Sequence, residues 1–190
     1  MAQASETGAP VSRADVGALI TTHIRDVPDY PEPGVMFKDI TPLLATSAAF
    51  AEVVDALAGP YLDSAGGPVD KVAGIEARGF ILAAPVALRL GAGFVPVRKK
   101  GKLPSATFEE SYQLEYGSAT IEVHQDAFMP GERVLIVDDV LATGGTARAT
   151  ANLVAKTGAE VAGIAVLMEL SFLNGRTPLT GIDVRSLLTV

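Results

Sequence analysis

Short apolar runs alternate with amphipathic segments along most of this chain. Residues 71–76, 93–98, 133–138 and 161–168 are largely apolar, and residues 182–190 close the chain in the same way. Strands that are buried on both faces of a parallel sheet show near-continuous apolar runs of this kind. Because helical patterns separate several of these runs, we predict an α/β fold with a central, mainly parallel β-sheet flanked by helices.

Apolar residues recur at helical spacing in the segments between the strands. Gly59-Pro60 and Gly158 are expected to end two of these helices, and Pro85 fits only if the regular part of its helix starts near it. The helices are expected over residues 14–24, 47–58, from after 79 to 90, and 145–157.

Two segments break this rhythm. Residues 28–34 are rich in proline and residues 35–44 are interpreted as a mixed loop, whereas residues 99–110 are irregular and lead into a hairpin over 111–123. Loops of this length within a compact domain are usually functional, so the 99–124 insertion is interpreted as a flexible flap.

Composition narrows the possible function. The chain has 190 residues, 48% of them hydrophobic, a net charge of -7 and no cysteine. Its length suits one domain, expected over residues 13–190, after a disordered tail at 1–12. An acidic chain is a poor partner for nucleic acid, and without cysteine a structural zinc centre is not expected. No apolar stretch is long enough for a membrane span or a signal sequence, so a cytoplasmic location is expected.

The candidate chemistry lies where the predicted strands end, because ligands of parallel sheets bind at the carboxyl ends of the strands. Asp138 and Asp139 end one strand, and Thr143-Gly144-Gly145-Thr146 follows at the start of a helix. Two glycines, two hydroxyls and a helix N-terminus suit a phosphate, although an ordinary strand-to-helix turn would look similar. The carboxylates suit a sugar diol, or they are solvated loop acids. Together, the glycine turn and the two carboxylates favour a phosphorylated sugar as the ligand.

Positive charge is concentrated at two other strand ends. Five of the 15 lysines and arginines lie there, namely Arg78, Arg98, Lys99, Lys100 and Lys102. They suit a second polyanion such as a diphosphate, with arginine giving bidentate contacts. A solvated charge run remains the alternative for residues 99–102.

These motifs resemble those of a known family. The run 134-VLIVDDVLATGGT-146 resembles the signature with which type I phosphoribosyltransferases bind 5-phosphoribosyl 1-diphosphate. The segments 32-EPGVMFKDITPLL-44, 76-EARGF-80, 98-RKKGKLP-104 and 111-SYQLEYG-117 are similar to those of the adenine phosphoribosyltransferases, in the same order. The resemblance covers about residues 14–185 and implies transfer of phosphoribose to adenine, giving AMP and diphosphate in purine salvage.

The resemblance also implies a role for individual residues. Asp138 and Asp139 would hold the ribose diol, and the 5-phosphate would lie against Ala142, Thr143, Gly144, Gly145 and Thr146. Arg78 and Arg98 would bind the diphosphate, and Lys102 would reach a site across a homodimer interface. In the base-binding segment, about residues 28–44, Phe37 would stack on adenine and the backbone of Val35 and Lys38 would read its edge. Glu115 would act as the acid near the imidazole side of the base, helped by Tyr116, and Mg²⁺ would be carried by the diphosphate with no direct protein ligand.

Two alternatives remain open from the sequence. The base could be hypoxanthine, guanine, xanthine or orotate, because the chemistry of the leaving group would be the same. A regulator that senses the diphosphosugar and binds DNA is disfavoured by the pI near 4.8 and by the lack of room for a helix-turn-helix domain before residue 35.

Overall fold

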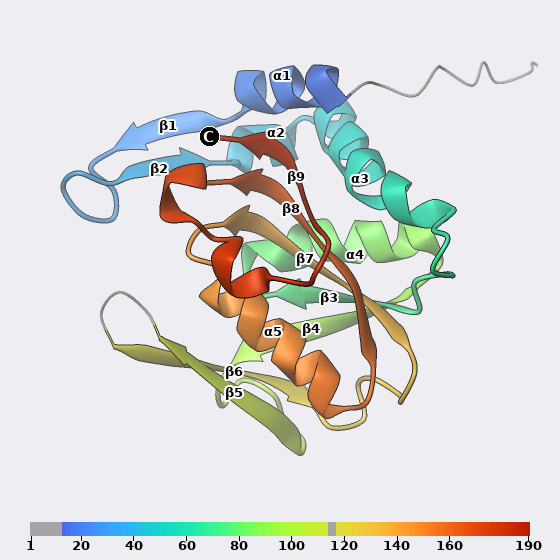
Figure 1. Ribbon diagram of the computed structural model, residues 1–190. Coiled ribbons are helices and arrows are strands. Elements are labelled where there is room, and N and C mark those ends of the chain that lie inside the picture. The colour runs from blue at the N-terminus through green and yellow to red at the C-terminus, as the bar shows by residue number, and fades with distance from the viewer. Residues whose placement is uncertain (1–12, 114–116) are drawn as a thin grey trace, which may run out of the picture.

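The computed structural model describes residues 13–113 and 117–190, which form a seven-stranded sheet covered by helices on both faces (Figure 1). The strand order is β5-β6-β4-β3-β7-β8-β9, in which β4, β3, β7, β8 and β9 run parallel and the β5–β6 hairpin is antiparallel. The predicted fold class is confirmed. The strands are β3 Lys71–Ile75, β4 Gly93–Lys99, β5 Thr107–Gln113, β6 Ser118–His124, β7 Arg133–Leu141, β8 Glu160–Glu169 and β9 Val184–Thr189.

Two apolar layers hold the helices on the sheet. On one face, Ile136 of β7 packs with α5, whereas Leu135 and Val137 face the opposite layer, which contains α1 to α4. This alternation follows from the period of two in a strand. The helices are α1 Arg13–His23, α2 Thr41–Ala45, α3 Ser47–Leu62, α4 Arg78–Leu90 and α5 Gly145–Lys156, with short 3₁₀ helices η1 Ser171–Leu173 and η2 Thr177–Leu179.

Two helices do not follow the expectations that were based on proline. Helix α3 continues through Gly59-Pro60 to Leu62, and α4 begins at Arg78, seven residues before Pro85. In both helices buried residues lie on either side of the proline, including Tyr61 after Pro60 and Leu82 and Val86 around Pro85. Burial of these side chains outweighs the one backbone hydrogen bond that each proline removes.

Three further boundaries differ from the prediction. Residues 35–44 are not a loop: β2 Met36–Asp39 pairs antiparallel with β1 Arg25–Pro28, and α2 follows. Strand β5 starts at Thr107, inside the segment interpreted as irregular, and β7 continues to Leu141, so that both aspartates lie within the strand. Burial explains the last difference, because Val140 and Leu141, which follow the acidic pair, have apolar side chains that pack against the core.

The strand order determines where a crevice opens at the edge of the sheet. Strand β3 connects through α4 to β4 on one side of it, whereas β7 lies on its other side and connects through α5 to β8. Loops therefore leave β3 and β7 in opposite directions, which opens a crevice at the carboxyl ends of these strands. The β1–β2 ribbon and the β5–β6 hairpin lie on that same side of the molecule (Figure 1).

Candidate active site

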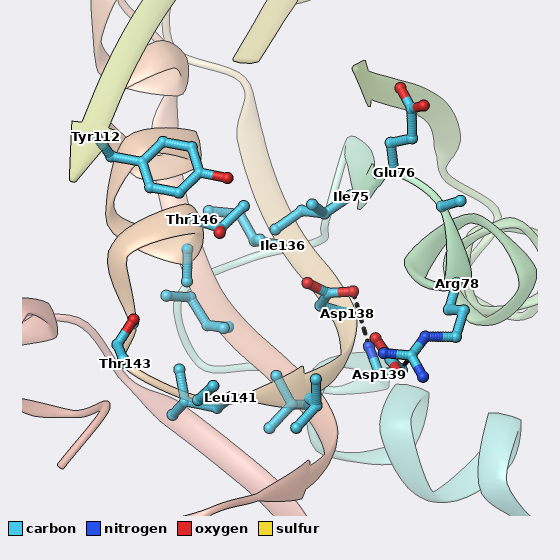
Figure 2. Close-up of a pocket in the computed structure, with 17 residues that line it drawn as sticks. Ile75, Glu76, Arg78, Tyr112, Ile136, Asp138, Asp139, Leu141, Thr143 and Thr146 are labelled. Atoms are coloured by element: carbon cyan, nitrogen blue, oxygen red, sulfur yellow. Dashed lines mark hydrogen bonds and ion pairs between the residues drawn. The ribbon is translucent and has the colours of Figure 1, made fainter. Parts of the chain in front are cut away.

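A pocket of about 330 Å³ opens at this crevice. Its size lies within the range of small-ligand sites. The residues after β3 and β7 that the sequence predicts to converge do converge here (Figure 2). From the predicted site, the lining includes Arg78, Asp138, Asp139, Ala142, Thr143, Gly144 and Thr146.

The two adjacent aspartates point to different partners. Asp138 projects into the pocket, whereas Asp139 lies against the first residue of α4, with 2.9 Å between its Oδ2 and Nε of Arg78 (Figure 2). Successive residues of a strand face opposite sides of the sheet, and the N-terminus of α4 lies on the side to which Asp139 turns. The two side chains therefore diverge, with Asp138 turned to the pocket and Asp139 paired with a cation.

Asp138 therefore has an unusual electrostatic environment. Burial and the adjacent carboxylate of Asp139 raise the pKa of Asp138 well above its ordinary value, although the backbone N–H of Asp139 donates to its Oδ1 at 2.9 Å. A carboxylate in this state gains from any ligand that donates hydrogen bonds to it, as the two hydroxyls of a sugar would.

Residues 142–146, the phosphate loop, connect β7 to α5. Gly144 has a φ of 81° and forms the N-cap of α5, a left-handed conformation that favours glycine. The N-terminus of α5, which is the positive end of its dipole, thereby lies at the pocket together with Thr143 and Thr146, whose side chains carry hydroxyls. The arrangement can bind an anion without a lysine or arginine in the loop.

Arg78 links this region to the predicted base-binding segment. Its guanidinium carbon lies 5.1 Å from the ring centre of Phe37, and Tyr30 packs edge-on against the same ring with 5.1 Å between the ring centres. Phe37 does not line the pocket itself. In the same segment, the backbone N–H of Val35 donates to the backbone carbonyl of Glu32 at 3.2 Å. Nζ of Lys38 forms an ion pair with Oδ1 of Asp26 at 2.8 Å.

The other predicted cations, Arg98 and Lys102, lie in a basic loop at residues 98–103 that stays outside the pocket lining. Two carboxylates hold this loop. Oε2 of Glu76 accepts the backbone N–H of Lys99 at 2.9 Å and Nε of Arg98 at 3.2 Å. Oε1 of Glu122, on β6, accepts the backbone N–H groups of Lys102 and Leu103, each at 2.9 Å.

The sequence pattern did not predict a role for these two acids or for Tyr112. Glu76 ends an apolar run, which could have marked it, whereas Glu122 alternates with apolar residues like any solvated strand residue but is only 3% exposed. Tyr112 belongs to the hairpin, yet its ring reaches the pocket from β5 (Figure 2).

Strand β5 is also attached to α5, because the Glu110 carboxylate accepts hydrogen bonds from Asn152 at 2.7 Å and from Lys156 at 2.5 Å.

Replacing Glu122 with Gln should loosen the basic loop. Burial favours the neutral acid, but backbone N–H groups of residues 101–103 outweigh it and hold the pKa of Glu122 below its ordinary value of 4.5. A lowered pKa stabilises the fold above the unfolded pKa and loses that contribution as the pH falls through the folded pKa. We therefore expect Glu122→Gln to lower the free energy of unfolding by about 1–2 kcal/mol at pH 7 and by less at pH 4.

Urea denaturation at both pH values would measure this difference. Glu109→Gln is the matched control, because Glu109 is the cross-strand neighbour of Glu122 and forms only an exposed ion pair with Lys100. Its effect should stay below about 0.5 kcal/mol. Equal effects of the two substitutions would contradict the assigned role of Glu122.

Several predictions concern residues or features that the structure does not test. Glu115, Tyr116 and the tail at 1–12 lie outside the described residues. Within residues 13–113 and 117–190, no group of three or more histidine or acidic side chains is arranged to hold a metal ion, and no helix is long and apolar enough to cross a membrane.

The crevice combines a helix N-terminus, which suits an anion, with a carboxylate that can accept hydrogen bonds from hydroxyls, and this arrangement is typical of proteins that act on phosphorylated sugars. The sequence matches the phosphoribosyl transferase domain over residues 43–177, more than half of the chain. It is also 65% identical over 177 residues to an adenine phosphoribosyltransferase of Acidothermus cellulolyticus, covering 93% of this chain and 98% of that protein.

Solved structures of adenine phosphoribosyltransferases share this fold. The crystal structure of adenine phosphoribosyltransferase from Rhodothermus marinus superimposes with a TM-score of 0.87 at 52% identity, covering 93% of this chain and 99% of that one. The enzyme from Saccharomyces cerevisiae, solved with adenine and an imino-altritol bisphosphate, superimposes with a TM-score of 0.86 at 36% identity, covering 92% and 99%. The chain belongs to the phosphoribosyltransferase family, among the adenine phosphoribosyltransferases.

Proposed function

We propose that the protein transfers the 5-phosphoribosyl group of 5-phosphoribosyl 1-diphosphate to adenine, giving AMP and diphosphate, and so acts in purine salvage. The observation that carries this proposal is the pocket between β3 and β7, in which a sugar-facing carboxylate and a phosphate-binding helix N-terminus lie together. The 61–67% identity to several adenine phosphoribosyltransferases supports adenine as the base.

The sugar and its phosphate would bind as follows. The 2- and 3-hydroxyls donate to Asp138, with Asp139 beside it, and the 5-phosphate accepts hydrogen bonds from the phosphate loop. Adenine attacks the anomeric carbon as the bond to the diphosphate oxygen breaks, so positive charge develops on the sugar and negative charge on the leaving group. Arg78 lies at the pocket and can stabilise that negative charge if it shares its guanidinium between Asp139 and the diphosphate.

Phe37, Val35 and Lys38 form the proposed adenine site. The ring of Phe37 is already held by Tyr30 and Arg78, which would present a fixed surface to a planar base. Arg98 and Lys102 are proposed to complete the diphosphate site when the basic loop moves toward the pocket. Lys102 is exposed and lies outside the pocket of its own chain, which supports a role across a homodimer interface.

Mg²⁺ is the proposed cofactor. Asp138 presents one carboxylate to the pocket, which suits contact with a hydrated ion better than a complete protein cage. The ion would bind mainly through the diphosphate and neutralise the leaving group. Since the phosphorylated substrates and AMP are highly charged and do not cross membranes unaided, the cytoplasm is the proposed location.

Glu115→Gln tests the acid proposed at residue 115, in the sequence between β5 and β6. Loss of a group that exchanges a proton with the base should lower kcat by about 100-fold while KM for phosphoribosyl diphosphate changes little. Steady-state kinetics with adenine would measure this. Tyr116→Phe serves as the companion variant with a smaller expected loss, and wild-type kcat in Glu115→Gln would reject the role of Glu115.

The proposed function is tested by AMP formation from adenine, phosphoribosyl diphosphate and Mg²⁺, with hypoxanthine, guanine, xanthine and orotate in parallel reactions. Turnover with adenine alone is expected. Turnover with a different base would keep the sugar site and overturn the assignment of residues 35–38. No turnover with any base would reject the enzyme.

A further inference from the structure

The segment that contains both 3₁₀ helices, residues 171–179, lies directly against the phosphate loop. We call it the strap. A Cβ atom built on Gly175 of the strap would collide with the backbone carbonyl of Ala142, and it would lie 2.9 Å from Cγ of Leu141. A Cβ atom on Gly144 would collide with the carbonyl of Gly175 and lie 2.8 Å from Cγ of Pro178. The backbones of strap and phosphate loop therefore interlock at two glycines.

This interlocking gives the phosphate loop a rigid outer wall. Gly144 is in a left-handed conformation at the N-cap of α5, where the direction of the backbone N–H groups depends on small rotations. Because the backbone of Gly175, which is not part of the pocket lining, lies against both Ala142 and Gly144, the phosphate loop has little room to move toward the strap. The position of Gly175 thus sets the position of the anion-binding groups.

Arg176, the next residue, fixes the strap to the sheet. Its Nε donates to both carboxylate oxygens of Glu169, at 2.8 and 3.0 Å, and its Nη2 donates to Oε2 at 2.7 Å. Its Nη1 donates at 2.9 Å to the backbone carbonyl of Val184 on β9. One guanidinium thus joins the strap to the ends of two strands.

The partners of Arg176 are themselves fixed. Glu169, at the end of β8, is 7% exposed, and its Oε2 also accepts the hydroxyl of Ser186 at 3.1 Å. The planar guanidinium has several donors in fixed directions, so it sets orientation as well as distance. Lysine at position 176 could keep the charge but could not reproduce contacts to Glu169 and Val184 with the same geometry.

We propose that Arg176 is a positioning residue for the 5-phosphate of the substrate, acting through Gly175 on the phosphate loop. Arg176 does not line the pocket and touches no reacting atom. Its role rests on the proposed function, because it assumes that the phosphate loop binds the phosphate of phosphoribose. The Arg176–Glu169 pair thus affects the affinity for the ligand in addition to any contribution that it makes to stability.

Equilibrium binding of three separate probes, ribose 5-phosphate, inorganic diphosphate and adenine, tests this role in the full chain. For Arg176→Met we expect the Kd for ribose 5-phosphate to rise about tenfold, whereas the Kd values for diphosphate and adenine stay within about twofold. Steady-state kinetics should show a raised KM for phosphoribosyl diphosphate with kcat changed much less. Arg176→Lys should fall between the wild type and Arg176→Met.

Arg185→Met is the matched control. Arg185 lies on β9, forms an ion pair of 2.8 Å with Asp183, and its side chain is 49% exposed, compared with 48% for Arg176. It does not hold the strap, so its replacement should leave all three Kd values unchanged. If Arg176→Met fails to fold, Arg176→Lys provides the same comparison.

The possible results separate the role of Arg176 from the proposed function on which it rests. Unchanged binding of ribose 5-phosphate in all the strap variants, or equal losses for all three probes, would overturn the role of Arg176 alone. Failure of the wild-type chain to bind ribose 5-phosphate would overturn the proposed function together with this role.

Discussion

Asp138→Asn should lower kcat/KM for phosphoribosyl diphosphate by about 100-fold while making the folded protein more stable at neutral pH. The loss of activity is expected because Asn presents one acceptor oxygen and no charge to the sugar hydroxyls at the pocket. The gain in stability is expected because burial and Asp139 raise the pKa of Asp138 well above its ordinary value of 3.8. Folding therefore opposes ionisation of this side chain.

The sign of the pH dependence follows from the raised pKa. The folded state binds the proton more tightly than the unfolded state, so the stability associated with this group is complete below the unfolded pKa and is lost as the pH rises through the folded pKa. Asn removes the carboxylate and with it this loss. The unfolding midpoint of Asp138→Asn should thus exceed that of the wild type at pH 8, and the two should converge near pH 4.

Asp139→Asn is the matched control, because it makes the same chemical change one residue away with the opposite expected effect on stability. Asp139 is 4% exposed and its carboxylate pairs with Arg78, so its neutralisation removes this ion pair as well as the repulsion with Asp138 and should lower the free energy of unfolding by about 1 kcal/mol at neutral pH. Thermal unfolding of both variants between pH 4 and pH 8 would measure the contrast. A lower midpoint for Asp138→Asn than for the wild type at pH 8 would contradict the electrostatic assignment.

Local signals were sufficient to predict the sheet, most of the helices and the phosphate loop. Apolar runs identified β3, β4, β7 and β8, and the glycine turn after β7 located the N-terminus of α5. Even the divergence of Asp138 and Asp139 follows from the period of a strand. These features depend on neighbours in the sequence, which is why the sequence alone predicts them.

The features that were missed depend on contacts between distant residues. The burial of Glu122 arises from its contacts with a loop about 20 residues away, and nothing in its own strand distinguishes it from a solvated acid. The β1–β2 ribbon was missed because its strands are only four residues long and none of their residues is fully buried. Proline was given too much weight at residues 60 and 85, since the burial of surrounding side chains decides whether a helix continues.

Gly144→Ala should both destabilise the fold and abolish tight binding of the 5-phosphate. The φ of 81° is strained for alanine, and the added Cβ would collide with the carbonyl of Gly175, a backbone group that cannot rotate away. Relief requires the phosphate loop and the strap to separate, which we expect to cost about 3 kcal/mol of the free energy of unfolding. The same separation would turn the N–H groups at the start of α5 away from the phosphate.

Gly145→Ala isolates the cause of this effect, because the neighbouring glycine is not in a left-handed conformation. The closest atom to its added Cβ would be at the edge of the Tyr112 ring, at 3.2 Å, and no backbone atom would lie closer than 3.5 Å, within the first turn of a helix that favours alanine over glycine. We expect its free energy of unfolding to stay within about 1 kcal/mol of the wild type. Urea denaturation and ribose 5-phosphate binding of both variants would show whether interlocking with Gly175, rather than loss of any glycine from the loop, governs the phosphate site. Equal destabilisation by the two substitutions would reject that explanation, and a large loss at Gly144 alone would show that the strap and the phosphate loop form one structural unit.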